Sequence, residues 1–397
     1  NELEEGINLR DFDIFIDKNI TKNGEYVAFD DNAYGYATVR VNVNGGGGDS
    51  FGLVDRTVVD ATYSGISVVG SYAFAFCELL YKASFPECTE ISGSAFLNCI
   101  NLQNVSFPVC ETIGSYAFYN CTLLTSAVFP ECKILHASAF YGCTELENAS
   151  FPNCSSIPEG AFNDCTKLSN VYFPVCTHIS RIGFAGCDLR EVSFPSCVRV
   201  GNGAFAECRY LTSIYIPICE SVGDRAFRYC ANLTYVALSA CTYIGSEAFS
   251  NCVTLTDITL PACTYIHNMA FAACTALSVI KLLGSSFCSA GSYVLRTSIA
   301  GVAPQTLASI YVPESLYYRY IQAPNWSYYS SQFVGCLSDG TPVISVYSAY
   351  YSENVLYFGG AGVSMNNGQL TLTNSSITRT HYYDGGSRPI WILNVKT

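Results

Sequence analysis

Charged residues are scarce in this chain of 397 residues. They make up 13% of the sequence, whereas soluble globular proteins usually contain about a quarter. The 20 lysines and arginines are outnumbered by 32 acidic residues, which gives a formal net charge of −12. The basic residues form no patch or run, so we do not expect nucleic acid as a partner.

Long hydrophobic runs are also missing, although 50% of the residues are hydrophobic. A helix that crosses a bilayer needs roughly 18 or more consecutive apolar residues, so no membrane span is expected. No signal peptide is recognisable at Asn1, and no Leu-Pro-x-Thr-Gly anchor occurs. If the protein is exported, we expect its leader to be absent from this chain.

Residues that carry catalysis or bind metals are few and scattered. The chain has four histidines, of which His136 and His267 hold the same repeat position six repeats apart and cannot share a site. Cys336 and His381 could be written as a nucleophile and its base, but nothing in their flanking sequence supports that chemistry. The glycines at 45–48 lack the lysine of a phosphate-binding loop. We therefore expect no catalytic residue, no metal site, no cofactor and no enzyme activity.

What the chain has instead is a repeat, shown by residues 101–122, NLQNVSFPVCETIGSYAFYNCT. Its Ala-Phe pair recurs every 22 residues, except for one step of 21 residues. In that short unit Cys187-Asp188-Leu189 replaces the usual Cys-x-x-Leu. A fixed period of this length is the signature of a solenoid. The marker phenylalanines are Phe74, Phe96, Phe118, Phe140, Phe162, Phe184, Phe205, Phe227, Phe249 and Phe271.

Each unit contains one short strand, which ends at a proline such as Pro108 because proline has no N–H to donate. An apolar residue and, in several units, a glycine such as Gly114 then mark a turn. The following Ser-x-Ala-Phe segment suits a helical or 3₁₀ turn. No unit can bury its apolar positions alone, so the units are predicted to stack around one core.

This unit resembles the bacterial leucine-rich repeat of the BspA-like type, through Leu-x-x-Val-x-Phe-Pro, Ile-Gly and Ala-Phe-x-x-Cys. The resemblance covers residues 66–335. It departs from the pattern where His136 and His267 replace the glycine and where Gly183 replaces the alanine. The expected fold is an α/β solenoid of about ten coils of 22 residues, with a parallel sheet on one face. The resemblance implies a secreted or surface-attached protein that binds other molecules.

Four regions are predicted along the chain: a small N-terminal β module at 1–44, a glycine-rich linker at 45–50, the leucine-rich repeat domain with its caps at 51–335, and a small C-terminal β domain at 336–397. The first region contains Asn23-Gly24, a hairpin signal, and an alternating strand at 35–43. Its pattern resembles modules of gut-bacterial surface proteins and of phage tail-associated proteins.

The two ends of the solenoid require caps. Residues 51–64 are expected to form a strand that covers the first coil. At the other end, residues 307–313 are expected to form the last strand and residues 314–323 a helix. The segment VPESLYYRYIQAPNW resembles the closing cap of BspA-like repeats.

The 21 cysteines allow three interpretations, since 19 of them fall in two columns of the repeat. Disulfides are disfavoured because the two columns lie at opposite ends of the strand, beyond the ~7 Å that a bridge spans. A metal site is disfavoured because no Cys-x-x-Cys occurs and no histidine follows the columns. We favour buried free thiols that act as small apolar side chains, because Ile66 stands at a position where Cys recurs. Thiols in such number also suggest a reducing or anoxic setting.

The outward positions of the strands are the expected binding surface. Most of them are small and polar, as on any solvated β surface. Tyr172, Arg190, Tyr215 and Tyr235 depart from this pattern, and two of these tyrosines share a column two coils apart, about 10 Å at the usual strand spacing. Tyrosine and arginine are enriched at binding hot spots. These four residues are the predicted ligand site.

We expect an extracellular or cell-surface protein that binds a protein or glycan of host or neighbouring cells, in adhesion or host interaction. Two alternatives remain open. The chain could be a phage or prophage tail-associated recognition protein, or the solenoid could be a passive spacer that presents the C-terminal β domain. The sequence gives no indication of the oligomeric state.

Overall fold

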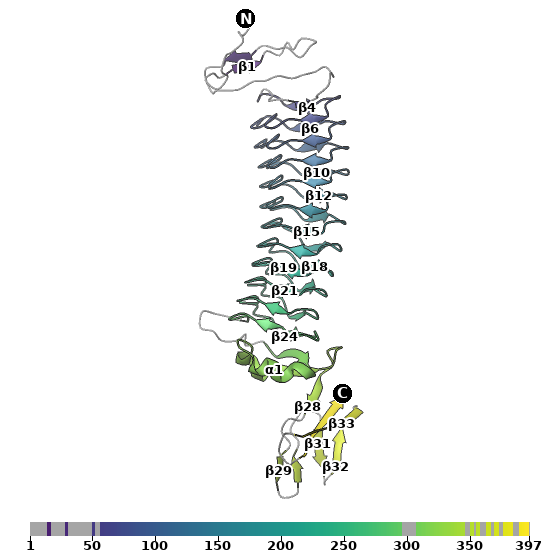
Figure 1. Ribbon diagram of the computed structural model, residues 1–397. Helices are drawn as coiled ribbons and strands as arrows, with labels where there is room; N and C mark the ends of the chain where they lie inside the picture. The colour runs from purple at the N-terminus through teal and green to yellow at the C-terminus, as the bar shows by residue number, and fades with distance from the viewer. Residues whose placement is uncertain are drawn as a thin grey trace.

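A computed structural model describes residues 56–295 and 307–342 with their side chains, and elsewhere only the backbone of short strands. The described part is a stack of coils, which forms one elongated column (Figure 1). The predicted leucine-rich-repeat solenoid with a parallel sheet is confirmed, and it contains about twelve coils.

One three-residue strand per coil builds the wider sheet. Neighbouring strands pair in parallel and are offset by one repeat, as Asn148 pairs with Asn170. The strands of the solenoid before the C-terminal cap are β4 (Asp60–Thr62), β6 (Lys82–Ser84), β8 (Asn104–Ser106), β10 (Ser126–Val128), β12 (Asn148–Ser150), β14 (Asn170–Tyr172), β16 (Glu191–Ser193), β18 (Ser213–Tyr215), β20 (Tyr235–Ala237), β22 (Asp257–Thr259) and β24 (Val279–Lys281).

Each coil carries a second, two-residue strand that the sequence did not predict. These strands also pair in parallel and make a second, narrow face of the solenoid, in one ladder from β3 to β11 and another from β13 to β25. They are β3 (Ser50–Phe51), β5 (Val68–Val69), β7 (Glu90–Ile91), β9 (Thr112–Ile113), β11 (Ile134–Leu135), β13 (Ser156–Ile157), β15 (His178–Ile179), β17 (Arg199–Val200), β19 (Ser221–Val222), β21 (Tyr243–Ile244), β23 (Tyr265–Ile266) and β25 (Ser289–Ala290).

The core between the two sheets is built from stacked phenylalanines. The ring of Phe74 lies parallel to that of Phe96, with 5.0 Å between their centroids, and this stack continues coil by coil to Phe271. A second stack begins at Phe85 and meets the first edge to face. From Ile216 onward, aliphatic side chains replace this second stack. Each coil thus buries its apolar positions only against its neighbours, as the period predicts.

All 21 cysteines are free and buried, which confirms the prediction of buried thiols. The thiols do more than pack as small apolar side chains, because most of them also donate hydrogen bonds. In one column the thiol points at a phenylalanine carbonyl of the preceding coil, as Cys121 does to Phe96 at 3.1 Å. In the other column the thiol points at the carbonyl two residues ahead, as Cys88 does to Glu90 at 3.1 Å.

The Ala-Phe segment forms hydrogen-bonded turns in which two residues per coil are left-handed, so no helix forms there. Ala75 donates its N–H to Tyr72 as in a 3₁₀ turn, while Phe74 and Phe76 donate theirs to the next coil. These bonds between coils hold the left-handed conformation even where the residue is not glycine. The two left-handed columns are Tyr72, Ser94, Tyr116, Ser138, Gly160, Ile182, Gly203, Arg225, Glu247, Met269 and Tyr293, and Phe76, Asn98, Asn120, Gly142, Asp164, Gly186, Glu207, Tyr229, Asn251 and Ala273.

The C-terminal end of the solenoid is closed by a compact cap. Strand β26 (Ser309–Pro313) continues the wide sheet and is followed by the 3₁₀ helix η2 (Glu314–Leu316), helix α1 (Tyr317–Gln322) and the 3₁₀ helix η3 (Ser327–Gln332). Trp326 and Tyr320 fill the space below the last coil, and the indole N–H donates to Cys288 O at 2.8 Å. The expected strand and helix are present, but β26 is not the last strand, because β27 (Phe333–Cys336) pairs with it in parallel.

Near the ends of the chain the structure describes only strands. They are β1 (Ile14–Ile16) and β2 (Ala28–Asp30), then β28 (Val343–Ser345), β29 (Tyr350–Ser352), β30 (Val355–Tyr357), β31 (Val363–Asn366), β32 (Gln369–Leu372), β33 (Ser376–Tyr383) and β34 (Pro389–Lys396). Their pairing is antiparallel. The strand expected at 35–43 and the linker at 45–50, apart from Ser50, lie outside the described residues.

Candidate functional site

The four predicted site residues lie on or beside three strands of the wide sheet. Tyr172 ends β14, Tyr215 ends β18, Tyr235 begins β20, and Arg190 directly precedes β16. The side chains point outward because each flanks an inward residue of its strand. All four are exposed, and the relative exposure of Tyr172 and Tyr235 is 57%. We call these four residues the tyrosine patch.

The pairing register of the wide sheet shows how the members of the tyrosine patch lie relative to one another. Tyr215 pairs with Ser193, and Tyr235 pairs with Ser213, so these two tyrosines stand diagonally on adjacent strands. The hydrogen-bonded ladder of the wide sheet is interrupted between β14 and β16, as it also is between β8 and β10 and between β20 and β22. Tyr172 therefore belongs to the preceding ladder, and the patch straddles the interruption.

Arg190 is the cationic member of the tyrosine patch. Its backbone carbonyl accepts bonds from the N–H and hydroxyl of Thr212, at 2.7 and 3.0 Å. Its guanidinium makes no ion pair with any residue in the described part of the chain. An exposed arginine beside these tyrosine-bearing strands can offer a forked set of donors to a carboxylate or to a row of hydroxyls.

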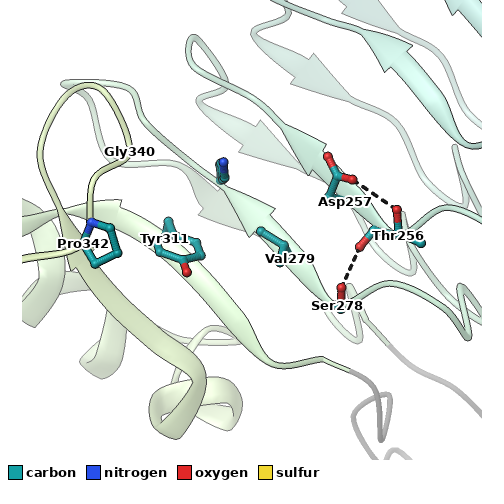
Figure 2. Close-up of a pocket in the computed structure, with 8 residues that line it drawn as sticks. Thr256, Asp257, Ser278, Val279, Tyr311, Gly340 and Pro342 are labelled. Atoms are coloured by element: carbon teal, nitrogen blue, oxygen red, sulfur yellow. Dashed lines mark hydrogen bonds between the residues drawn. The ribbon is translucent and has the colours of Figure 1, made fainter. Parts of the chain in front are cut away.

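A groove lies on the same face, at the C-terminal end of the wide sheet (Figure 2). It has a volume of about 570 Å³. The floor comes from β22, β24 and β26, and the far wall comes from the turn after β27. We call it the terminal groove. Its lining residues are Thr256, Asp257, Ser278, Val279, Lys281, Tyr311, Gly340 and Pro342.

Hydrogen bonds fix the polar side of the terminal groove. The hydroxyl of Thr256 donates to the Asp257 carboxylate at 3.1 Å, and the hydroxyl of Ser278 donates to the carbonyl of Thr256 at 3.1 Å (Figure 2). On the opposite side, the ammonium of Lys281 lies 5.9 Å from the centre of the Tyr311 ring. The groove thus presents a carboxylate, hydroxyls, an ammonium and an aromatic ring.

The sequence did not predict this groove, although it predicts the outward direction of some of its side chains. Strand alternation correctly predicts that Asp257, Val279 and Lys281 face outward, but it does not predict a concave surface. The wall depends on the turn in which Gly340 donates its N–H to Leu337 O, which carries Gly340 and Pro342 next to β26. No local signal indicates where that turn packs.

A second hollow, of about 420 Å³, lies on the turn side of the solenoid. Gly203 and Ala206, which have little or no side chain, are among its lining residues. Its arginines are already neutralised: Arg181 pairs with Glu159, and Arg225 and Arg228 both pair with Glu247. The paired charges and their position between coils are those of a structural ion-pair network.

Within the described residues, no three histidine, cysteine or acidic side chains gather where they could hold a metal ion. The same residues contain no helix that is both long and apolar enough to span a bilayer.

Comparison with protein families gives one match. A family model described as "BspA type Leucine rich repeat region (6 copies)" matches residues 67–188 and 177–300. These two ranges together cover more than half of the chain. No curated protein matches the sequence.

Several solved structures are similar in fold. A leucine-rich cell surface protein from Faecalibacterium prausnitzii is 23% identical, with 55% of this chain and 77% of that chain covered and a TM-score of 0.39. A leucine-rich repeat protein from Bacteroides ovatus is 17% identical, with 82% and 98% covered and a TM-score of 0.39. A leucine-rich repeat protein from Eubacterium ventriosum is 19% identical, with 64% and 87% covered and the same TM-score of 0.39.

Proposed function

This chain belongs to the BspA-type leucine-rich repeat family, and from that premise we propose that it is an extracellular or surface-attached protein that binds a macromolecule, protein or glycan, through the tyrosine patch. The role we assign to it is adhesion to host or neighbouring cells.

The tyrosine patch is the observation that carries this proposal. Tyr172, Tyr215 and Tyr235 are each about half exposed on a face that is otherwise covered mostly by small polar side chains. The three rings lie on β14, β18 and β20 of one sheet face, and aromatic surface that gathers on one face is typical of an interaction site. Large aromatic side chains with few rotamers give much contact area for little loss of conformational entropy, which is why they dominate binding surfaces.

The fold supports the same function. A solenoid displays successive strands at a spacing of about 4.8 Å, so equivalent side chains form columns along the molecule. An extended ligand can contact several coils at once, and each coil adds contact area without any change of the core. This geometry suits a macromolecule better than a small metabolite.

The test is a binding screen of the intact chain against a glycan array and a panel of host surface and matrix proteins, under reducing conditions. For each reproducible ligand, the double variant Tyr172→Ala/Tyr215→Ala is compared with Tyr72→Ala/Tyr328→Ala. The control tyrosines are 52% and 80% exposed, compared with 57% and 49% for the two patch tyrosines, but they lie on the turn side and on the cap.

We expect the patch variant to weaken binding at least tenfold, because hot-spot truncations commonly cost about 2 kcal/mol or more. The control variant should bind like the wild type. Equal binding by both variants would refute the tyrosine patch as the site. A screen that detects no ligand would favour the function of the solenoid as a spacer.

A further inference from the structure

The lysines of the solenoid pair with a carboxylate of the preceding coil, except for Lys281. Four lysines lie in the described residues, and three of these pair with a carboxylate 22 residues earlier, one coil away. The pairs are Lys82 with Asp60, Lys133 with Glu111 and Lys167 with Glu145. For Lys281 the register places Thr259 at that position, so no carboxylate stands there.

Lys281 is also less exposed than an ordinary surface lysine. Its side chain is half-buried on the floor of the terminal groove, between Thr259 and Tyr311 in the sheet register. The Tyr311 ring offers it only a cation–π contact at 5.9 Å. No carboxylate in the described part of the chain forms an ion pair with Lys281, and a half-buried cation of this kind favours the arrival of an anionic group.

The other lining groups indicate what should surround that anion. Asp257, Thr256 and Ser278 offer oxygen atoms that accept from, or donate to, hydroxyl groups. Val279 and Tyr311 offer apolar surface that can lie against a ring. The Asp257 carboxylate would repel a second anion nearby, so the best match has one carboxylate and several hydroxyls.

An acidic peptide fits this groove less well than a sugar. Extended peptides commonly bind by adding a strand to a free sheet edge. Here β24 pairs with β22 on one side and β26 on the other, so its backbone has no free edge. Recognition in the groove must therefore rely on side chains alone.

We propose that the terminal groove binds an acidic saccharide, with Lys281 holding the sugar carboxylate and Asp257 with Ser278 binding its hydroxyls. This site is separate from the tyrosine patch and does not depend on it. The terminal groove would therefore prefer sugars that carry a carboxylate, such as uronic or sialic acids, over neutral sugars.

The experiment measures binding of the intact chain by calorimetry to three acidic oligosaccharides, which contain galacturonic, glucuronic or sialic acid. Each is compared with its counterpart in which the carboxylate is reduced to an alcohol, and tri-glutamate is the peptide probe. We expect at least one acidic sugar to bind at least about tenfold more tightly than its neutral counterpart, because a charged hydrogen bond is lost on reduction.

Lys281→Gln should remove that preference, whereas the matched control Lys133→Gln should keep it, because Lys133 is an exposed lysine in an ion pair elsewhere. If Lys281→Gln does not fold, Tyr311→Leu provides the second variant and should weaken the acidic sugar several-fold. The Tyr172→Ala/Tyr215→Ala variant should still bind it, which separates this site from the tyrosine patch. The proposal is overturned if no acidic sugar is preferred, if tri-glutamate binds as tightly, or if folded Lys281→Gln keeps the preference.

Discussion

The thiol of Cys99 donates a hydrogen bond to the backbone carbonyl of Phe74 in the preceding coil, with 2.9 Å between sulfur and oxygen. The same bond recurs in each following coil as far as Cys274. In the short coil the separation is 24 residues, and elsewhere it is 25. This column of thiols therefore ties successive coils together as well as filling space.

Replacing this thiol tests whether the hydrogen bond matters. Cys99→Ala should destabilise the solenoid by about 1–2 kcal/mol, because it removes both a net hydrogen bond and some packing volume. Cys99→Ser should lower the stability of the solenoid less, because the serine hydroxyl can still donate to the Phe74 carbonyl. Urea unfolding followed by circular dichroism measures the difference. If the thiol were only a small apolar side chain, serine would be the more damaging change.

Stability should fall steeply at alkaline pH. Burial raises the pKa of Cys88 and Cys219 to about 11, and that of Cys110 and Cys176 to about 12, from the ordinary value of 9.0. An unfolded thiol ionises above pH 9.0, while the buried thiol stays neutral, so the stabilising contribution is complete below pH 9.0 and is lost as the pH rises towards 11–12. In that window, each such thiol lowers the free energy of unfolding by about 1.4 kcal/mol per pH unit.

Because these losses of stability add up over many thiols, the chain should unfold cooperatively a little above about pH 10. Thiolate absorbance and circular dichroism, recorded together from pH 7 upward, should change in the same step. Thiolate that appears well before the loss of secondary structure would show that the buried thiols ionise in the folded chain.

Gly245 marks a place where two coils approach too closely for a side chain. A Cβ atom added there would lie 2.5 Å from the carbonyl carbon of Gly223 and 2.6 Å from the amide nitrogen of Asp224. Gly245→Ala should therefore destabilise the protein by about 1–3 kcal/mol through overpacking. Gly93→Ala is the control, because its backbone is not left-handed and its Cβ would lie an ordinary 3.4 Å from the nearest atom, the carbonyl oxygen of Ser115. Equal thermal midpoints for both variants would contradict the close approach.

Ile182 has a left-handed backbone with φ +48°, which a β-branched side chain adopts at a cost. Glycine occupies the same position in the adjacent coils, at Gly160 and Gly203. Ile182→Asn should raise stability by up to about 1 kcal/mol, because asparagine tolerates this conformation. Val128→Asn, at an exposed strand position, should lower it instead, because asparagine is a poor strand former. A loss of similar size in both variants would show that the packing of Ile182 outweighs its strain.

The period of 22 residues predicts much of the fold, because every coil repeats the environment of the one before it. Phe96 and Cys99 are buried for the same reasons as Phe118 and Cys121 one coil later. The deletion in Cys187-Asp188-Leu189 likewise predicts that the hydrogen-bond separation shortens by one residue there. The period does not predict the left-handed conformation of residues such as Ile182, because bonds to the next coil impose it.

The amino-acid sequence by itself determined the solenoid, its buried thiols and the outward orientation of Tyr172, Tyr215, Asp257 and Lys281. These follow from alternation and from a repeat that contacts only its neighbours. Only the tertiary structure decided that β14 and β16 are not joined by the ladder, and that the turn with Gly340 and Pro342 packs beside β26 to make a groove. The turn depends on contacts between segments that no repeat unit encodes, since it lies where the repeat ends. The ladder is also interrupted between β8 and β10 and between β20 and β22, where the period is regular, so the period does not predict these interruptions either.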